Sequence, residues 1–260
     1  VEPFPLEITA AASSSVGVTE ITLVPDTSAY TDAAYGDGRF LACDVLGNLS
    51  ESEDGLSWSA ITPTGDSIVG AKSIAYGAGR YVIVTVGGKI LSSSDGVSFT
   101  QHVNEPTRTF YKVLWTGTRF VATYAGNDSN PANLGSLYIS DDGINWVRIV
   151  SESNIPLYDV AFDGSTGLLA VGDYEEVGGS DSNVFTYSSD GGSTWLHVRR
   201  PLGDSLIRGV GHNGTNLWVI VGSHGSQGVS WTSVDGQNFS NRTYHPSVST
   251  LTDVHWTGTT

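Results

Sequence analysis

The apolar residues of this chain come in short runs separated by turns. Between residues 73 and 103 the runs "SIAYG", "RYVIVTV", "GKILSSS" and "SFTQHV" follow one another, and they are rich in β-branched and aromatic residues. Gly-containing turns between such runs are typical of consecutive antiparallel strands. No window of helical length carries an apolar stripe at helical spacing. The pattern predicts an all-β protein.

Two short motifs alternate along the chain, which is therefore built from repeats. The first reads "AYGDGRFLA" (34–42), "AYGAGRYVI" (75–83), "LWTGTRFVA" (114–122), "AFDGSTGLLAV" (161–171) and "GHNGTNLWVI" (211–220). The second reads "SEDGLSW" (52–58), "SSDGVSF" (93–99), "SDDGINW" (140–146), "SSDGGSTW" (188–195) and "SVDGQNF" (233–239). A further copy of the first motif begins at "HWTGTT" (255–260).

The repeat length predicts the architecture. Each unit spans about 40 to 50 residues and reads as four strands, the period of a propeller blade. We therefore expect a β-propeller of four-stranded antiparallel blades, with five complete repeats and the start of a sixth. Residues 28–260 form this domain. Residues 1–27 form an arm or linker that either completes the last blade or leads in from an upstream segment, in which case the last blade continues beyond residue 260.

The second motif has the chemistry of a tight hairpin turn. An Asp side chain accepts hydrogen bonds from backbone N–H groups of the turn, and the following Gly adopts a positive φ without steric cost. The Ser hydroxyl adds a local hydrogen bond, and the aromatic residue covers the turn. We therefore assign a structural role in the turns to five aspartates: Asp54, Asp95, Asp142, Asp190 and Asp235.

These turns resemble the Asp-box, also called the bacterial neuraminidase repeat, with the pattern Ser-x-Asp-x-Gly-x-x-Trp. The copy "SSDGGSTW" matches in full, whereas the other four are one residue shorter and two of them carry Phe99 or Phe239 in place of Trp. The resemblance implies a propeller but not one function, because Asp-box propellers include sialidases, receptors, assembly factors and virion proteins. The chain lacks the Arg-Ile-Pro motif of sialidases. Arg39, Arg80 and Arg119 share one turn position, which indicates a structural role.

Charge and composition exclude several classes of partner. The chain has 12 Lys and Arg against 27 Asp and Glu, a net charge of −15, which repels nucleic acid and anionic lipid. No apolar run approaches the roughly 18 residues of a membrane span. Cys43 is the single cysteine and stands in the apolar stretch "FLACDVL", so we expect a buried, unreactive thiol. Neither nucleic acid nor membrane insertion is predicted.

The repeats differ in the loops at one end of the predicted propeller. From the aromatic residue of the first motif to the Asp of the second there are 19 residues in the first two repeats, but 27 and 28 in the third and fourth. Apart from one residue in the first turn of the fourth repeat, the added residues fall at the end opposite the Ser-Asp-Gly turns, where a rigid scaffold usually carries its binding groups. Amide, carboxylate and aromatic side chains there suit a glycan or protein receptor, and the carboxylates could also hold Ca²⁺. The candidate ligand-binding residues are Asn127, Asp128, Asn130, Tyr174, Glu175, Glu176, Asp181 and Asn183.

These observations favour a noncatalytic recognition or attachment module. Acidity, scarce lysine and the resemblance to propellers of phage tails, virion decorations and secreted bacterial proteins predict a virion or extracellular cell-surface location. The expected partners are a glycan or protein receptor and other virion or surface subunits. No catalytic residue is assigned and no cofactor other than Ca²⁺ is considered. The alternatives are a glycoside hydrolase, for which Asp128, Glu175 and Asp181 are the first carboxylates to test, and a scaffold for protein assembly.

Overall fold

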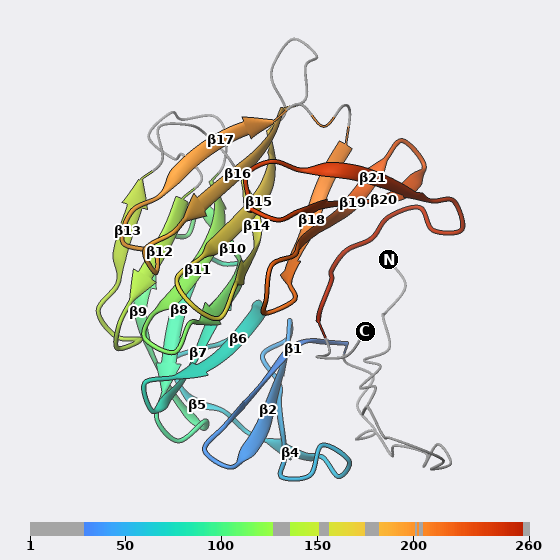
Figure 1. Ribbon diagram of the computed structural model, residues 1–260. Coiled ribbons are helices and arrows are strands. Elements are labelled where there is room, and N and C mark those ends of the chain that lie inside the picture. The colour runs from blue at the N-terminus through green and yellow to red at the C-terminus, as the bar shows by residue number, and fades with distance from the viewer. Residues whose placement is uncertain are drawn as a thin grey trace.

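A computed structural model describes residues 29–126, 136–150, 156–174, 182–200, 202 and 205–256. The arm expected at residues 1–27 lies outside this part of the chain. The described residues contain strands and turns but no helix, and accordingly none of them forms a helix that could cross a membrane. The strands form five sheets, each of which contains one of the five repeats (Figure 1).

Each sheet is a meander of four antiparallel strands in sequence order. Sheet 1 consists of β1 (Tyr30–Gly36), β2 (Arg39–Asp44), β3 (Leu49–Ser52) and β4 (Ser59–Ile61). Sheet 2 consists of β6 (Ala71–Gly77), β7 (Arg80–Thr85), β8 (Lys89–Ser93) and β9 (Ser98–Asn104), and the short β5 (Thr64–Gly65) adds to β9 in parallel.

The remaining three sheets repeat this order. Sheet 3 consists of β10 (Arg108–Trp115), β11 (Phe120–Gly126), β12 (Ser136–Ser140) and β13 (Val147–Val150). Sheet 4 consists of β14 (Leu157–Phe162), β15 (Leu168–Tyr174), β16 (Ser182–Ser188) and β17 (Leu196–Arg200). Sheet 5 consists of β18 (Ser205–His212), β19 (Trp218–His224), β20 (Gln227–Ser233) and β21 (Ser240–His245).

The first strand of each sheet is the innermost one. β1, β6, β10, β14 and β18 contact one another in succession, so the sheets are arranged around a common axis (Figure 1). Residues 251–256 continue this series without forming a strand. They lie along β18, because a Cβ placed on Gly209 would be 2.8 Å from Asp253 Cα and one on Gly211 would be 2.8 Å from Val254 O. This segment occupies the position expected for the first strand of a sixth repeat.

Apolar side chains fill the space between neighbouring sheets. Four buried clusters lie one in each of the four interfaces between consecutive sheets, and their largest fully buried members include Leu41, Tyr81, Phe120 and Phe185. Cys43 belongs to the first cluster, and burial raises the pKa of its thiol to about 12. The second strands of sheets 2, 3 and 4, β7, β11 and β15, are thus apolar on both faces, as expected for sheets packed on both sides.

The turns between the third and fourth strands share one hydrogen-bonding pattern. In the third repeat Asp142 Oδ1 accepts from Ile144 N at 2.8 Å and Asn145 N at 2.7 Å, and Ser140 Oγ accepts from Gly143 N at 2.8 Å. Equivalent bonds to the carboxylate form at Asp54, Asp95, Asp190 and Asp235. Backbone donors lower the pKa of Asp54 to about 2. The carboxylate therefore supplies the acceptors that the turn backbone lacks.

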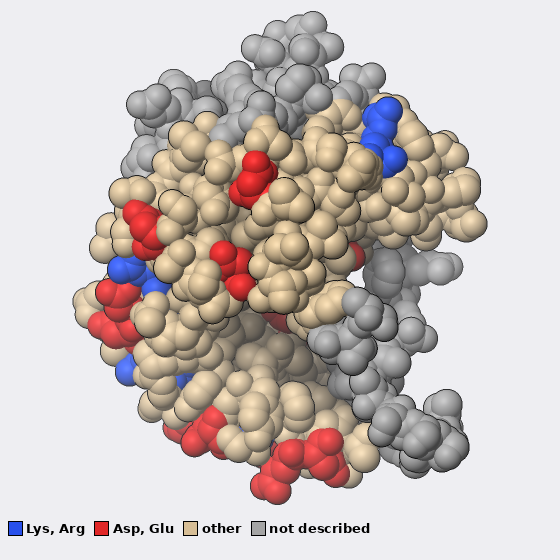
Figure 2. Space-filling model, viewed as in Figure 1, with Lys and Arg blue, Asp and Glu red and all other residues tan. Residues whose placement is uncertain are grey.

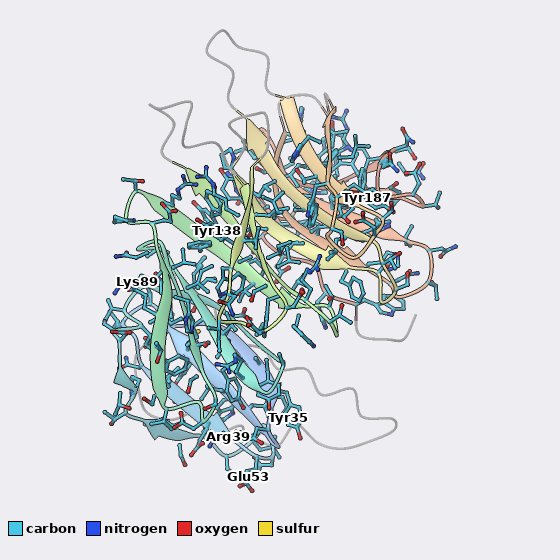
Figure 3. All side chains as sticks on the ribbon, turned by 90° about the vertical axis from the view of Figure 1, so that its left-hand side faces the viewer. Tyr35, Arg39, Glu53, Lys89, Tyr138 and Tyr187 are labelled. Carbon is cyan, nitrogen blue, oxygen red and sulfur yellow. The ribbon has the colours of Figure 1, made fainter. Side chains whose placement is uncertain are left out.

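The first motif joins neighbouring sheets. The ring of Tyr76 covers Gly36 and that of Trp115 covers Gly77, so closely that a Cβ on either glycine would overlap the ring. Arg39 donates from its guanidinium to Asp95 O, in the Ser-Asp-Gly turn of the next repeat. Tyr35, Arg39 and Glu53 lie together at this end of sheet 1 (Figure 3). We call this end of the molecule the turn end and the opposite end the loop end.

Candidate functional site

The loop residues that the sequence nominates for binding fall largely outside the described part of the chain. Tyr174 ends β15 and Asn183 lies near the start of β16, and the two strands pair there through Tyr174↔Ser182 and Asp173↔Asn183. This pairing is at the loop end of sheet 4. The other six candidates are not among the described residues: Asn127, Asp128, Asn130, Glu175, Glu176 and Asp181.

A β-bulge interrupts the first strand of every sheet at the same repeat position. The register shifts between Tyr30 and Asp32 in β1, and at the equivalent point in β6, β10, β14 and β18. A bulge turns two consecutive side chains toward the same side of a strand that otherwise alternates. The bulged residues, four positions before the aromatic residue of the first motif, are Thr31, Lys72, Tyr111, Tyr158 and Arg208.

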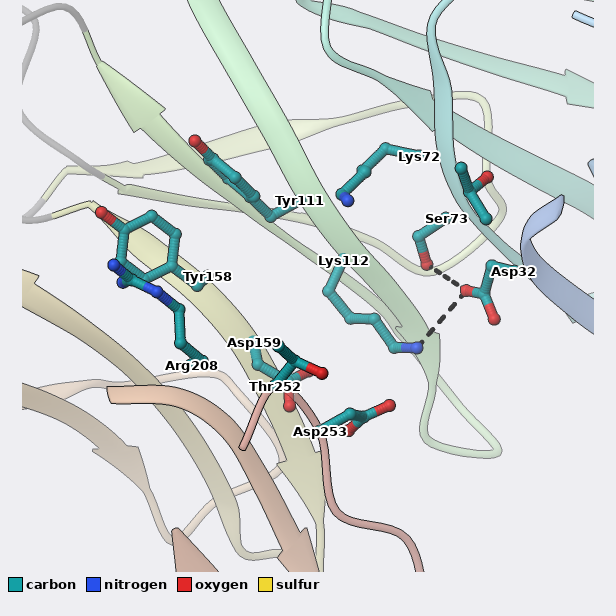
Figure 4. A pocket seen from close by; sticks show the side chains of 11 residues that line it. Asp32, Lys72, Ser73, Tyr111, Lys112, Tyr158, Asp159, Arg208, Thr252 and Asp253 are labelled. Carbon is teal, nitrogen blue, oxygen red and sulfur yellow. Dashed lines mark hydrogen bonds and ion pairs between the residues drawn. The ribbon is translucent and has the colours of Figure 1, made fainter. Parts of the chain in front are cut away.

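These bulges line a cavity of about 500 Å³ on the common axis (Figure 4). In every repeat, the lining comes from one or both of two consecutive residues, four and three positions before the aromatic residue of the first motif. The level nearer the loop end, which we call the axial mouth, comprises Thr31, Lys72, Tyr111, Tyr158, Arg208 and Thr252. The next level toward the turn end, which we call the axial floor, comprises Asp32, Ser73, Lys112, Asp159 and Asp253.

The ammonium group of Lys112 lies at the centre of the axial floor. Its Nζ is 3.3 Å from Asp32 Oδ2, and the carboxylates of Asp159 and Asp253 also face it (Figure 4). Burial opposes the charge on this lysine, but the attraction of Asp32, Asp159 and Asp253 outweighs burial and raises the pKa of Lys112. The floor is therefore a cluster of three carboxyl groups around one internal cation.

Two of these carboxylates also connect neighbouring sheets. Asp32 Oδ2 accepts from Ser73 Oγ at 2.6 Å and from Ile74 N at 3.2 Å, both in β6. Asp159 Oδ2 accepts from Val210 N of β18 at 2.8 Å, while its Oδ1 accepts from Val160 N at 2.8 Å. Since the same repeat position bonds the next first strand in both cases, the floor holds the first strands in register around the axis.

Asp159 has the most perturbed carboxyl group of the floor. Desolvation raises its pKa to about 7, against the lowering effects of Lys112 and the backbone donor Val210. A carboxyl group with a pKa near neutrality is a candidate general acid. However, both oxygens of Asp159 accept backbone hydrogen bonds and the residue is buried, with 8% of its surface exposed. The geometry therefore favours a structural role for this carboxyl group.

The axial mouth combines aromatic rings with cationic groups. The rings of Tyr111 and Tyr158 meet edge to face, with centroids 4.9 Å apart, and the Arg208 guanidinium lies 4.6 Å from the centroid of the Tyr158 ring. Lys72 is exposed and forms no ion pair with a described residue. Figure 4 shows the two tyrosine hydroxyls and the Arg208 guanidinium pointing away from the floor. The mouth thus presents polar groups on a rigid aromatic base.

A second hollow of about 420 Å³ extends from the floor toward the turn end. It shares Lys112, Asp159 and Asp253 with the first cavity, and its far wall contains His212 and Trp256. The floor cluster therefore separates two chambers on one axis. In neither chamber, nor elsewhere among the described residues, are three or more His, Cys, Asp or Glu side chains placed to hold a metal ion.

The sequence contains a signal for this cavity, although motif reading passes over it. Aligned on the aromatic residue of the first motif, the repeats can be compared three and four positions earlier. There they carry Thr-Asp, Lys-Ser, Tyr-Lys, Tyr-Asp, Arg-Gly and Thr-Asp. Each pair contains at least one polar or charged side chain in an otherwise apolar strand, and only the fifth pair has a glycine as its second residue. Polar side chains at this position of every repeat indicate the lining of the axis, as opposed to an interface between sheets.

Comparison with known families identifies the fold. A model of the DUF6242 β-propeller domain matches residues 8–225. The chain belongs to this family. The prediction of an all-β propeller is thereby confirmed, and the match to the DUF6242 domain also covers most of the arm expected at residues 1–27. No curated protein sequence matches the chain.

Solved structures share the fold of this DUF6242 domain at low sequence identity. YCF48 bound to a D1 peptide is 18% identical over 85% of this chain and 68% of that one, with a TM-score of 0.59. YCF48 from Cyanidioschyzon merolae is 14% identical over 85% and 73%, with a TM-score of 0.55. The calcium-binding protein regucalcin from Agrobacterium tumefaciens is 12% identical over 87% and 77%, also with a TM-score of 0.55. At these identities the likeness concerns the fold alone.

Proposed function

We propose that this DUF6242 domain is a noncatalytic recognition module that binds an extended segment of a partner protein at the axial mouth. The observation that carries the proposal is the cavity of about 500 Å³, lined by equivalent positions of successive repeats that hold different side chains. Its volume lies within the range of about 300 to 1,000 Å³ typical of ligand sites. Residues that only stabilise the fold can be the same in each repeat, as the turn aspartates are. The variation among the lining residues therefore favours a role in binding.

The chemistry of the mouth suits a peptide. Tyr111 and Tyr158 offer large, rigid contact surfaces, and such aromatic residues together with arginine dominate binding energy in protein interfaces. A backbone N–H group of a bound segment can donate to the hydroxyl oxygen of Thr31, whose own proton is directed to the carbonyl oxygens of Ala71 and Cys43, and the hydroxyl of Thr252 lies at the same rim. The fold neighbour YCF48 has been solved with a bound peptide. This neighbour supports a peptide as the first ligand to test.

An attachment role on a virion or bacterial surface is the cellular setting we propose for this recognition. A glycan receptor is the competing ligand, because sugar faces also stack on tyrosine rings. The candidate loop residues, among them Tyr174 and Asn183, would extend the contact beyond the cavity at the same end of the molecule. Hydrolysis at the cavity is less well supported, because the buried carboxyl group of Asp159 accepts backbone hydrogen bonds at both oxygens. The carboxylates first named for a hydrolase, Asp128, Glu175 and Asp181, lie outside the described residues.

The test selects a random peptide library on the whole chain and titrates the enriched peptides by calorimetry. We expect the double variant Tyr111→Ala, Tyr158→Ala to bind at least about tenfold more weakly, because losing central aromatic contacts typically costs 1 to 2 kcal/mol or more. Tyr35→Ala is the matched control, since Tyr35 is an exposed tyrosine at the turn end. Binding that is insensitive to the mouth variant, or that is found with glycans but with no peptide, would reject the proposal.

A further inference from the structure

Four exposed aliphatic side chains lie together at the loop end of sheets 1 and 2. They come from the β2–β3 turn, the segment before β6 and the β7–β8 turn, and we call them the apolar patch: Val45, Leu46, Val69 and Val86. Their exposed fractions range from 41% to 64%. A Cβ on Gly47 would be 3.2 Å from Val69 Cγ2, and one on Gly70 would be 3.1 Å from Val86 Cγ2. The three chain segments therefore present one continuous surface.

Backbone hydrogen bonds hold the apolar patch in a fixed shape. Gly70 N donates to Val45 O at 2.7 Å, and Val86 N donates to Gly70 O at 2.8 Å, so the three segments are bonded to one another. Lys89 N donates to Thr85 Oγ1 at 3.1 Å and closes the β7–β8 turn. A surface that is already ordered loses little conformational entropy when a partner covers it.

The turns at the loop end do not require apolar residues in order to fold. The equivalent turn of sheet 5 joins β19 to β20 through Gly225 and Ser226. At the turn end, the exposed aliphatic side chains of Leu56, Ile144 and Val234 are distributed over the Ser-Asp-Gly turns of three different sheets. Single exposed apolar side chains are usual on a protein surface, whereas a cluster of them marks an interaction site.

The apolar patch continues into the axial mouth. Thr31 of the mouth donates from Oγ1 to Ala71 O at 3.1 Å, and Ala71 stands between the patch segment and the mouth residue Lys72. Thr109 of β10, a strand that also lines the mouth, donates from Oγ1 to Val86 O at 3.3 Å. A segment bound in the mouth can therefore extend over the patch while it stays in contact with the protein.

Two of the three lysines of the chain border the apolar patch, although the net charge is −15 and acidic side chains are spread over the face seen in Figure 2. Lys72 lies on the axial side, and Lys89 begins β8 on the outer side, away from the turn end (Figure 3). Neither forms an ion pair with a described residue, whereas Glu105, which bonds to the β7–β8 turn, pairs with Arg108. The border therefore favours an acidic partner. It disfavours a second copy of this chain, in which the same lysines would meet across a twofold axis.

We propose that the apolar patch receives a large aliphatic or aromatic side chain from an acidic partner segment whose adjoining residues occupy the axial mouth. This inference rests on the proposed function and adds a second contact for the same segment. An extended segment advances about 3.3 Å per residue, so the anchoring side chain stands at a constant number of residues from the part held in the mouth. Lys72 and Lys89 favour an acidic residue beside this anchor.

The experiment selects a random peptide library in parallel on the wild-type chain and on the variant Leu46→Ser, Val69→Ser. We expect Leu, Ile, Phe or Met to be enriched at one peptide position by the wild type and not by the variant. A selected peptide and its copy with Ser at that position should differ in affinity, measured by calorimetry, by about tenfold on the wild type. On the variant the two peptides should differ by less than about twofold, because the contact is already lost.

The variant Leu56→Ser, Val234→Ser is the matched control. It also removes one Leu and one Val, which are 52% and 74% exposed but lie at the turn end, and it should select the same peptides as the wild type. Melting temperatures establish that each variant is folded, and Leu46→Ser alone provides the test if the double variant is unstable. Lys89→Gln should weaken binding of a selected acidic peptide by about threefold and reduce its dependence on salt, as for an exposed charge pair.

The outcomes separate this inference from the proposed function. Peptides that depend on Tyr111 and Tyr158 but bind the patch variant as tightly as the wild type would overturn the inference and leave the proposed function intact. Peptides that depend on the patch and not on these tyrosines would reject the proposed function, and with it a segment that spans both surfaces. Selection of basic peptides would overturn the acidic character of the partner. Self-association of the wild type in sedimentation, absent in the patch variant, would identify a second copy as the occupant and overturn the inference. A library that yields no peptide would reject both proposals.

Discussion

The turn end and the axial mouth are built from the same repeats but use them in opposite ways. At the turn end, equivalent positions carry the same residue and make the same bonds, as the five Ser-Asp-Gly turns do with Asp54, Asp95 and their counterparts. At the mouth, equivalent positions carry Thr, Lys, Tyr, Tyr, Arg and Thr. The turn residues are uniform because every sheet must satisfy the same backbone donors in its own turn. The mouth is a single surface to which each repeat contributes one side chain.

This difference indicates where substitutions should affect folding and where they should affect binding. Changes at the turn end or between sheets should lower the free energy of unfolding. In the molecules that stay folded, they should leave the ligand contacts unchanged. Changes at the mouth should act mainly on affinity. Four substitutions test the folding half of this comparison, from the largest expected effect to the smallest.

Gly77→Ala should produce the largest loss of stability. A Cβ at this position would lie 2.1 Å from Cδ2 of Trp115, so the ring that locks sheet 3 onto sheet 2 must move. We expect a loss of about 3 kcal/mol in the free energy of unfolding, measured by urea denaturation, as for an overpacked interface. Gly87→Ala is the matched control, because its Cβ would have no neighbour nearer than 3.7 Å. Equal stability of the two variants would show that Trp115 does not lock the sheets.

Asp159 should make stability fall as pH rises toward neutrality. Its pKa is raised to about 7 in the folded chain, whereas an unfolded Asp titrates near 4, so between these values the folded state binds more protons. The free energy of unfolding should therefore decrease between pH 5 and pH 7, by about 1.4 kcal/mol per pH unit at most for one group, and level off above pH 7. Urea denaturation at several pH values should show a flatter profile for Asp159→Asn than for the wild type.

A substitution of Lys112 tests the same floor cluster by removing its cation instead of its carboxyl group. Because its ammonium lowers the pKa of Asp159, Lys112→Met should move the pH-dependent fall in stability to higher pH. A pH profile unchanged in both variants would mean that the carboxyl group of Asp159 is not the group that titrates.

The turn chemistry could be predicted from the sequence because it is local. Ser140, Asp142 and Gly143 lie within four residues, and the bonds among their side chains and backbone follow from residue type. The axial site could not be predicted in the same way. Tyr111 and Lys112 are consecutive, and in a regular strand their side chains would point to opposite faces. The bulge in β10 directs both to the axis, and sequence periodicity does not record such a shift of register.

The choice of the loops as the binding region shows a related limit. Loop length is visible in the sequence, so the insertions in the third and fourth repeats nominate Asn130 and Glu176 for binding. The cavity requires several first strands to meet around one axis, a relation between residues as far apart as Thr31 and Thr252. Only the assembled fold brings these positions together. The mouth lies at the loop end, and the choice of the loop residues as a binding region stays a prediction.

Asp142→Ala should have the smallest effect of the four, about 1 kcal/mol, comparable with the loss of a side chain that caps backbone donors. Its carboxylate accepts from Ile144 N and Asn145 N, and these donors hold its pKa below the usual range. A lowered pKa means that the contribution is present above about pH 4 and is lost as pH falls, so the variant should lose less stability than the wild type on acidification.

The neighbouring Asp141→Ala is the control: Asp141 forms an exposed ion pair with Arg119, and such pairs contribute little. If Asp141→Ala proved as destabilising as Asp142→Ala, the turn carboxylate would have no special role. Peptide binding at the mouth should be unchanged in both variants, because neither side chain lines the cavity.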